Sequence, residues 1–286
     1  MNLPRFTENA SNDKNDPLTD DAVKAHRSEA VVLALLGRAA AGLQDRRPLR
    51  VLDFGCGRGL VTAALRRQGF ACHGVDIDKT YVDNAQAYFG SAGDARGDDP
   101  DCPDYPIVSL LDPAGRSIFP DRYFDVIISD QVLEHVRDLD AAAAEIGRLT
   151  APGGLGLHIF PSQLCLMEPH MKLPVVHWVP KGAARRSLIR TLLAMGMGAR
   201  YFRDLGLDAR TQIFADFSES ETFYRGGRTL RAAFARAGLS CAVAVQEKLR
   251  LRGGIASTIA RLPVVGAAAA WAYETFWQTY LETRRR

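Results

Sequence analysis

Residues 51–59 read VLDFGCGRG, and this stretch decides the fold of the chain. An apolar run at Leu49–Phe54 leads into glycines at alternate positions, and Leu60–Gln68 then has the composition of a helix that ends at Gly69. A short apolar run that ends in glycines is typical of a buried parallel strand, so the stretch predicts a strand, a glycine turn and a helix. Glycine has no side chain and tolerates unusual φ/ψ angles, so such a turn lets the backbone approach a ligand closely.

The same alternation of strands and helices continues as far as Pro161. Residues 91–106 are rich in Gly, Asp and Pro and are predicted to form a loop. Five strands separated by helices predict an α/β fold, with a doubly wound, mostly parallel, Rossmann-like sheet and helices on both faces. The further predicted strands are Ala71–Asp76, Ile107–Leu111, Tyr123–Ser129 and Leu155–Phe160, and the further predicted helices are 21–43, Tyr81–Phe89 and Asp140–Leu149.

The pattern changes after Pro161 and returns late. A helix is predicted at Thr229–Ala237, followed by a strand that begins at Leu239 and ends either at Gln246 or at Leu251, and only residues 253–259 are a candidate for one more strand. The predicted segments are a flexible tail at 1–20, the ligand-binding domain at 21–161, a largely helical substrate-side insertion at 162–228, the end of the sheet at 229–254 and an amphipathic helical tail at 255–286.

The composition is that of a globular protein with one large domain, or one domain with an appendage. Of the 286 residues, 47% are apolar and 24% are charged, which allows a sizeable core. The five cysteines are odd in number, and no two of them have CxxC spacing. Neither a disulfide framework nor a structural zinc site is therefore expected, and the expected location is a reducing cytoplasm. The first 20 residues lack an apolar core, so no signal peptide is predicted.

The two parts of the chain carry opposite charge. Residues 1–160 hold 17 Lys and Arg against 24 Asp and Glu, whereas residues 161–286 hold 19 against 9. A basic half indicates either an anionic partner, such as a membrane surface, a phosphorylated carrier or nucleic acid, or a solvated basic face. The Arg-flanked apolar run at 183–197 and the aromatic run at 255–281 predict either a peripheral contact with the inner face of a membrane or helices packed on the domain or on a second subunit.

The glycine turn favours S-adenosylmethionine over a dinucleotide. The dinucleotide pattern is GxGxxG, whereas residues 55–59 give GxGxG. Asp53, just before the turn, would repel a pyrophosphate but attract the ammonium and sulfonium groups of S-adenosylmethionine. Asp76 comes about 20 residues after the turn, where doubly wound folds place an acid that binds ribose hydroxyls. Asp112 follows the third strand, and either meets the adenine amino group or forms the turn before Pro113.

Four motifs together resemble those of class I S-adenosylmethionine-dependent methyltransferases, of the kind known as type 11. They are VLDFGCGRG at 51–59, GVDID at 74–78, FDVIISDQVLEHV at 124–136 and LTAPGGLGLHI at 149–159. The resemblance covers 25–161 and, more weakly, 229–251, and it implies a closing antiparallel strand for which the sequence offers only a poor candidate. The expected cofactor residues are Asp53, Gly55, Cys56, Gly57, Gly59, Asp76, Ile77, Asp112, Ser129, Asp130 and Gln131.

Two groups of residues are candidates for the chemistry. Methyl transfer from a sulfonium is an in-line displacement that depends on positioning, and a hydroxyl acceptor also needs a base. His135, after the fourth strand, is either that base or a residue that orders the loop or lines the cofactor pocket. Glu168, His170 and His177 follow the fifth strand, at the edge where such a sheet opens its ligand crevice, and are either catalytic or part of a packed insertion. Their spacing fits no metal motif, so no metal is predicted.

The leading hypothesis is therefore O-methylation of a sugar, a polysaccharide or another small or lipid-linked acceptor. Residues 162–180 look similar to insertions in bacterial methyltransferases of surface-polysaccharide synthesis. One alternative is nucleic-acid methylation, which is disfavoured because the fourth motif lacks the Asn/Asp-Pro-Pro-Tyr/Phe element. The other is a non-catalytic protein that binds the cofactor, which the complete glycine turn argues against. A homo-oligomer is compatible with the apolar tail.

Overall fold

The computed structural model describes residues 16–25, 49–91, 105–251 and 254–285, together with Phe6 and Gly37. Helix α1 (Asp20–Ala25) is the described beginning of the helix expected at 21–43, most of which lies outside the described residues. Cys102 and part of the loop expected at 91–106 also lie outside them.

The main sheet has seven strands in the order β3-β2-β1-β4-β5-β9-β8. The first five strands are mutually parallel, whereas β9 runs antiparallel to both of its neighbours, β5 and β8. The predicted α/β sheet is therefore confirmed, including all five strands of its first part. The strands are β1 (Arg50–Phe54), β2 (Ala71–Asp76), β3 (Val108–Leu110), β4 (Phe124–Asp130), β5 (Thr150–Pro161), β8 (Leu239–Val243) and β9 (Gln278–Arg285).

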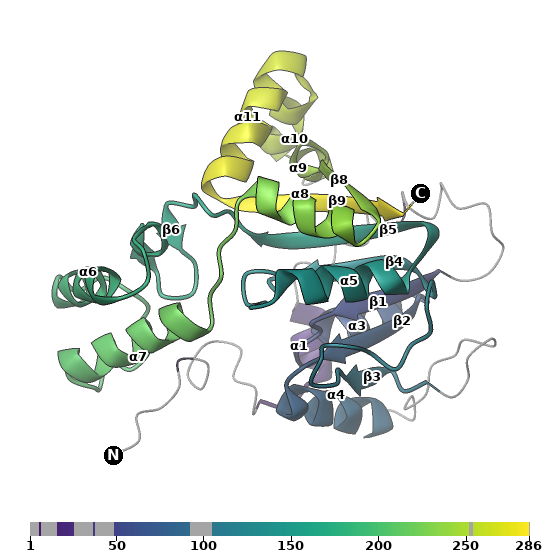
Figure 1. Ribbon diagram of the computed structural model, residues 1–286, viewed down its shortest axis with the longest axis horizontal. Helices are drawn as coiled ribbons and strands as arrows, with labels where there is room; N and C mark the ends of the chain where they lie inside the picture. The colour runs from purple at the N-terminus through teal and green to yellow at the C-terminus, as the bar shows by residue number, and fades with distance from the viewer. Residues whose placement is uncertain are drawn as a thin grey trace.

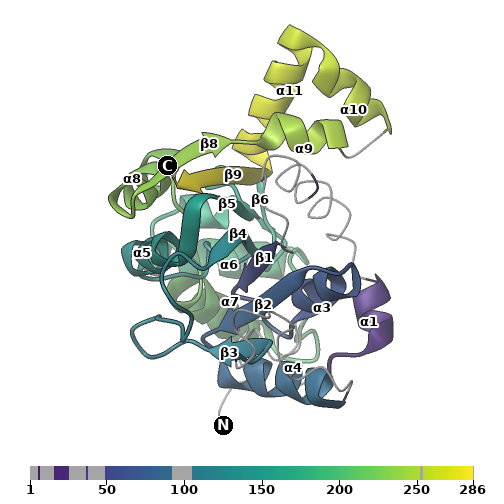
Figure 2. The same cartoon turned by 90° about the vertical axis from the view of Figure 1, so that its right-hand side faces the viewer.

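Helices cover both faces of the sheet, as Figures 1 and 2 show. On one face lie α5 (Leu139–Leu149) and α8 (Gly227–Arg236), whose apolar residues pack on β1, β4 and β5. On the other lie α1, α3 (Leu60–Arg67) and α4 (Lys79–Ser91). Strands buried on both faces must be apolar along their whole length, which explains the unbroken run at the centre of β4.

The C-terminal segment corrects the prediction. Residues 254–259 of the candidate strand belong to α10 (Gly254–Arg261), whereas residue 253 lies outside the described residues. The strand expected to reach Gln246 or Leu251 ends at Val243, before α9 (Val245–Leu251). The helical tail expected at 255–286 holds α10 and α11 (Pro263–Phe276), but its last part is strand β9, inserted between β5 and β8. The reason is that β5 has an unpaired edge, and β9 satisfies its backbone groups over seven residue pairs.

The insertion between β5 and α8 carries its own apolar core. It contains the short strands β6 (Met167–Glu168) and β7 (Leu173–Pro174), the 3₁₀ turn η2 (Val176–Trp178) and the helices α6 (Ala183–Ala194) and α7 (Leu207–Ser220). Figure 1 shows α6 and α7 side by side beyond the end of the sheet.

Of the two roles considered for residues 183–197, much of α6 adopts the packed one. Ile189 and Leu193 are buried against α7. The Arg185 guanidinium is also buried, and it donates hydrogen bonds to the carbonyl oxygens of Val179 and Ser218. In the described part of the chain, no helix combines the length and apolar character needed to cross a bilayer.

Candidate active site

The glycine turn joins β1 to α3 and lies between the end of β2 and the loop after β4. Gly55, Gly57 and Gly59 have φ values of 77°, 52° and 82°, a region that favours glycine. A Cβ at Gly55 would lie 2.5 Å from a methyl group of Val132, whereas a Cβ at Gly57 would meet no described atom within 4 Å. The turn is therefore packed against the loop after β4 and open above Gly57.

Asp53 has a role that the sequence did not predict. Its side chain is only 3% exposed, and one carboxylate oxygen accepts hydrogen bonds from the backbone N–H and the hydroxyl of Thr62, at 3.1 and 2.9 Å. Burial raises the pKa of Asp53 to about 7, and the nearby Asp130 adds to this effect. Asp53 thus fastens the start of α3 to β1 beneath the glycine turn.

Asp76 stands at the end of β2, as expected, and it touches the glycine turn. One oxygen accepts a hydrogen bond from the Gly57 N–H at 2.8 Å, and the other accepts one from the Asp78 N–H at 2.9 Å. Burial raises the pKa of Asp76. Ile77, which comes next, is an apolar side chain that is 69% exposed beside this carboxylate. The acid and the turn are therefore parts of one site. Cys56 lies under it, because a Cβ at Gly74 would be 2.7 Å from the Cys56 sulfur.

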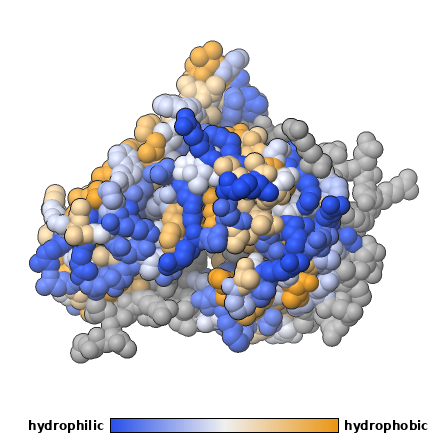
Figure 3. Space-filling model, in the orientation of Figure 1, coloured by the Kyte–Doolittle hydropathy of each residue, from blue (hydrophilic) through white to orange (hydrophobic). Residues whose placement is uncertain are grey.

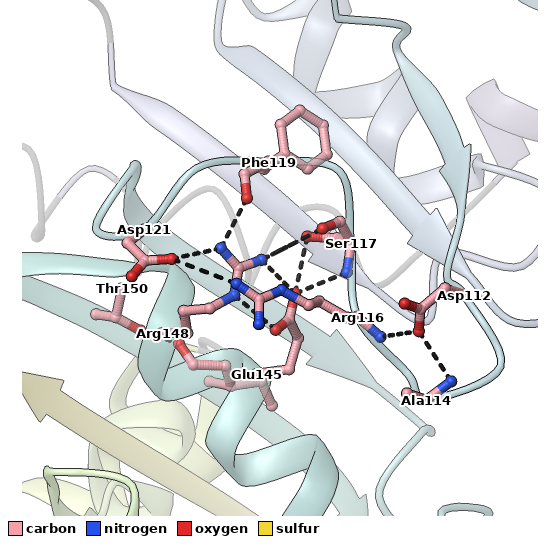
Figure 4. A network of polar contacts seen from close by, with 10 residues as sticks. Asp112, Ala114, Arg116, Ser117, Phe119, Asp121, Glu145, Arg148 and Thr150 are labelled. Carbon is pink, nitrogen blue, oxygen red and sulfur yellow. Dashed lines mark hydrogen bonds and ion pairs between the residues drawn. The ribbon is translucent and has the colours of Figure 1, made fainter.

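Asp112 orders a turn, the second of the two roles considered for it. One of its carboxylate oxygens accepts hydrogen bonds from the N–H groups of Ala114 and Arg116, both at 2.8 Å. Figure 4 shows this turn beside a polar network in which Arg148 contacts Glu145. Binding of adenine by Asp112 stays a prediction.

The end of β4 separates three of the expected cofactor residues. Ser129 is fully buried, and its hydroxyl lies 2.8 Å from Nδ1 of His158 on β5. Asp130 is half-buried, and Gln131 is exposed with a φ of 57°. The Gln131 N–H donates to the Ile159 carbonyl at 2.8 Å. Ser129 therefore points into the sheet's interior, which leaves Asp130 and Gln131 at its edge.

The fold brings His135, Glu168 and His170 into one cluster. The two Nε2 atoms of His135 and His170 lie 3.2 Å apart. The Nδ1 atom of His170 is 2.8 Å from a Glu168 carboxylate oxygen, and Nδ1 of His135 is 2.7 Å from the Glu221 carbonyl oxygen. Residues after β4 and β5 meet here because the carboxyl ends of parallel strands share one edge of the sheet.

Glu168 is fully buried and takes part in three hydrogen bonds. Burial opposes ionisation, but hydrogen bonds from His170, the Tyr224 hydroxyl and the Met171 N–H outweigh it and lower the pKa of Glu168. The pKa of His135 falls to about 4, because it is buried and lies beside His170. Burial and the neighbouring Glu168 raise the pKa of Tyr224.

Glu134 and Tyr224 are residues that the sequence reasoning missed. Glu134 is 2% exposed, and neither of its carboxylate oxygens has a hydrogen-bond partner in any other described residue. Burial raises its pKa well above the ordinary value. Its place before His135 was visible in the sequence, whereas nothing local pointed to Tyr224. Both line a small pocket with Leu133, Phe160, Pro161, Phe223, Arg225 and Leu230.

His177 stands apart from the other candidates. Its ring packs against Tyr224, with centroids 4.7 Å apart, and its Nε2 atom lies 3.4 Å from the sulfur of Cys165. Burial lowers its pKa. His177 therefore packs against Tyr224 and helps to position it. A catalytic role for His177 stays a prediction.

Comparisons with known proteins agree with this picture. A family model described as a methyltransferase domain matches residues 24–242. The ubiquinone biosynthesis O-methyltransferase of Mesorhizobium japonicum is 28% identical over 157 residues, which cover 53% of this chain and 57% of that protein. The uncharacterized methyltransferase Rv0089 of Mycobacterium tuberculosis is 30% identical over 139 residues, covering 48% of this chain and 61% of that protein. The chain thus spans less than two thirds of the length of these relatives.

Similar chains are also found among solved structures. The YcgJ protein of Bacillus subtilis superposes with a TM-score of 0.49 at 16% identity, covering 91% of this chain and 99% of that one. An S-adenosylmethionine-dependent methyltransferase of Mesorhizobium loti gives the same TM-score and identity, and the match covers 92% of this chain and 100% of that one. With a family model that matches most of its length and a seven-stranded sheet closed by an antiparallel strand, the chain belongs to the class I S-adenosylmethionine-dependent methyltransferase domain family.

Proposed function

We propose that this chain binds S-adenosylmethionine over the glycine turn and transfers its methyl group to a hydroxyl of a sugar, a polysaccharide or another small or lipid-linked acceptor. The observation that carries the proposal is the packing of Gly55 against Val132. Val132 belongs to the loop that continues into Glu134 and His135. A cofactor on the turn would therefore have the histidine cluster as its neighbour.

The residues around the turn supply groups that suit each part of the cofactor. The open space above Gly57 would receive the methionine portion, and the Asp76 carboxylate would accept hydrogen bonds from the ribose hydroxyls. The exposed side chain of Ile77 would cover one face of the adenine ring. Asp53 contributes indirectly, since it holds Thr62 and thereby the start of α3.

The cluster of His135, Glu168 and His170 suits an acceptor that must lose a proton. Bound S-adenosylmethionine would supply the methyl group: the acceptor oxygen would attack the methyl carbon in line, the carbon–sulfur bond would break, and sulfur would keep the electron pair, which gives S-adenosylhomocysteine. The hydroxyl proton leaves in the same process, and nearby proton-accepting groups accelerate such steps by about 10²–10⁴-fold. The O-methyltransferase activity in the name of the Mesorhizobium japonicum relative supports oxygen as the methylated atom.

The test is turnover of methyl-labelled S-adenosylmethionine by the full chain. Sugars, lipid-linked glycans, phenols, RNA and DNA would be offered separately, and products identified by mass spectrometry. Methylation of a hydroxyl in one of the first three classes supports the proposal. Methylation of nucleic acid alone, or cofactor binding without methylation of any class, would contradict it.

We also propose a peripheral membrane contact through α10 and α11, in a protein of the reducing cytoplasm. Figures 1 and 2 show these helices projecting beyond the sheet, and Figure 3 shows hydrophobic surface there. Val264 is 81% exposed, and Trp271 and Trp277 are exposed as well. Arg261 is an exposed cation on the same segment. Apolar and aromatic side chains next to basic ones suit the interface of an anionic bilayer.

Flotation of the full chain with anionic and neutral vesicles tests this contact. A variant with Val264→Ser, Trp271→Ser and Trp277→Ser should lose flotation with anionic vesicles. A matched variant with Leu110→Ser, Ile118→Ser and Met195→Ser, at exposed apolar residues outside α10 and α11, should keep it. Salt should weaken the binding. If the full chain does not float at low salt, the contact is absent. A concentration-dependent dimer that the first triple variant abolishes would instead identify a second subunit.

A further inference from the structure

We propose that Glu134, His135 and His170 form a binding site for a divalent cation of the first transition series or zinc. Each offers one ligand atom, and the three atoms all lie within 4.8 Å of one another. The inference deepens the proposed function and rests on it for the role of the cation, because this cluster is where we place the acceptor hydroxyl. Neither the sequence spacing nor the family motifs assign a metal here.

The hydrogen bonds of the two histidines leave their facing nitrogen atoms without protons. Nδ1 of His135 faces the Glu221 carbonyl oxygen, and Nδ1 of His170 faces the Glu168 carboxylate, which also accepts hydrogen bonds from the Tyr224 hydroxyl and the Met171 N–H. Both oxygens only accept, so both Nδ1 atoms carry hydrogen. In a neutral imidazole the other nitrogen then has a lone pair and no proton. Two such lone pairs face each other across 3.2 Å, which is repulsive unless a proton or a cation lies between them.

The distance between the two Nε2 atoms fits shared coordination. With metal–nitrogen bonds of about 2.0–2.1 Å, two nitrogen atoms 3.2 Å apart subtend about 100° at the metal. This angle lies between the values of ideal octahedral and tetrahedral geometry. The side chains would therefore need little movement to bind an ion.

Glu134 offers the third ligand, a carboxylate oxygen. It is 2% exposed, and no other described residue donates a hydrogen bond to its carboxylate. A buried carboxylate without a partner is costly unless it is neutralised or coordinates a metal. Since Glu134 precedes His135 on the same loop, the loop brings an oxygen and a nitrogen ligand to the site together.

The groups behind the ligands resemble the supporting groups of a metal site. Histidine ligands generally donate their second N–H to a carboxylate or a carbonyl, which fixes the ring and its tautomer. His170 is held by Glu168, and His135 by the Glu221 carbonyl. Glu168 is itself held by the Tyr224 hydroxyl and the Met171 N–H, both at 2.5 Å. The orientation of the rings is therefore set before any ion arrives.

The ligand set selects the class of ion and its role. Two imidazoles and one carboxylate suit Zn²⁺, Fe²⁺, Co²⁺ or Mn²⁺ better than Mg²⁺ or Ca²⁺, which prefer oxygen ligands. Three protein ligands leave a position open, and there the acceptor hydroxyl would bind and lose its proton to water more readily. The acceptor oxygen would then attack the methyl carbon as above, and no oxidant or reductant would be involved.

The test begins with the full chain freed of metal by a chelator. Co²⁺ and Zn²⁺ are titrated by calorimetry, and the Co²⁺ absorption spectrum reports the ligands. We expect one ion per chain, with affinity lowered at least 10-fold in Glu134→Gln and in His170→Asn. Glu168→Gln should lower affinity by about 10–100-fold, as for other groups behind a ligand. Glu221→Gln is the matched control, because its exposed side chain leaves the carbonyl that holds His135 unchanged.

The outcomes separate this inference from the proposed function. If wild type takes up no stoichiometric ion, or Glu134→Gln and Glu221→Gln bind equally well, the cation site is refuted, and a proton shared by the two imidazoles explains their contact. Circular dichroism and S-adenosylmethionine binding establish that each variant is folded. Full turnover by metal-free enzyme would refute the cation's role while leaving the proposed function intact. Stoichiometric binding without methylation of any acceptor would refute the proposed function instead.

Discussion

The Nε2 atom of His158 lies 3.2 Å from the hydroxyl oxygen of Thr283, between two strands that are distant in sequence. The opposite nitrogen, Nδ1, lies 2.8 Å from the Ser129 hydroxyl on β4. All three residues are fully buried, and burial lowers the pKa of His158 to about 3, so the ring is neutral. Buried polar groups thus link β4, β5 and β9 across the middle of the sheet.

Replacing Thr283 by valine should destabilise the domain. Valine has nearly the same shape but leaves a His158 nitrogen buried without a partner, which costs about 1–3 kcal/mol. The free energy of unfolding in urea measures this. Thr279→Val, on the same strand but partly exposed, should change it by less than about 0.5 kcal/mol. Equal effects of the two substitutions would show that the contact with His158 contributes nothing.

Truncation after Phe276 should abolish cooperative folding. It removes β9, which separates β5 from β8 and buries Tyr280, Leu281 and Thr283. Circular dichroism and thermal unfolding would show a broad transition or none, and a chain lacking only residue 286 is the control. A cooperative transition in the truncated protein would mean that the sheet closes without its antiparallel strand.

Gly57→Val should abolish binding of S-adenosylmethionine. The φ of 52° disfavours a branched side chain, and its methyl groups would fill the open space above the turn. Gly238→Val is the matched control, because Gly238 has a φ of 78° and equally open surroundings but lies between α8 and β8. Calorimetry should show loss of binding only in the first variant. If folded Gly57→Val bound S-adenosylmethionine with wild-type affinity, the cofactor would not bind at this turn.

Substitutions in the histidine cluster should lower turnover without loss of the cofactor. We expect His135→Ala, Glu168→Gln and His170→Asn each to lower kcat by about 10²–10⁴-fold. His177→Gln should have a smaller effect, because His177 contacts Tyr224 rather than the two facing histidines. The measurement is kcat at saturating S-adenosylmethionine, with binding checked by calorimetry. If all four variants keep near-normal kcat, the cluster supplies neither a base nor a cation that turnover requires.

The buried Asp53 should make stability depend on pH. Folding raises its pKa from 3.8 to about 7, so within this interval the folded state holds a proton that the unfolded state releases. The contribution of Asp53 to the free energy of unfolding therefore falls as pH rises through this window. Asp53→Asn keeps an oxygen for Thr62 but cannot ionise, so urea unfolding from pH 4 to 7 should show a smaller fall than in wild type. An identical pH dependence in the two proteins would contradict the raised pKa.

The sequence alone determined the first half of this protein. The strand, turn and helix at 51–68 were visible because neighbouring residues set them: buried parallel strands are apolar along their length, and a turn with positive φ needs glycine. Repetition of that unit then specified the parallel sheet. The acids at the strand ends were visible because they directly follow or end apolar strands. The buried position of Asp53 and its hydrogen bond with Thr62, however, are seen only in the structure.

Tertiary structure alone decided how the sheet closes and which groups meet in the site. Residues 278–285 follow a helix and have no strong pattern of their own, and they form β9 because β5 presents an unpaired edge more than a hundred residues earlier in the chain. Likewise, Tyr224 meets Glu168, and His135 meets His170, only when the insertion folds back over the loop after β4. Contacts between distant segments depend on packing and backbone pairing across the whole domain, which a local sequence pattern does not contain.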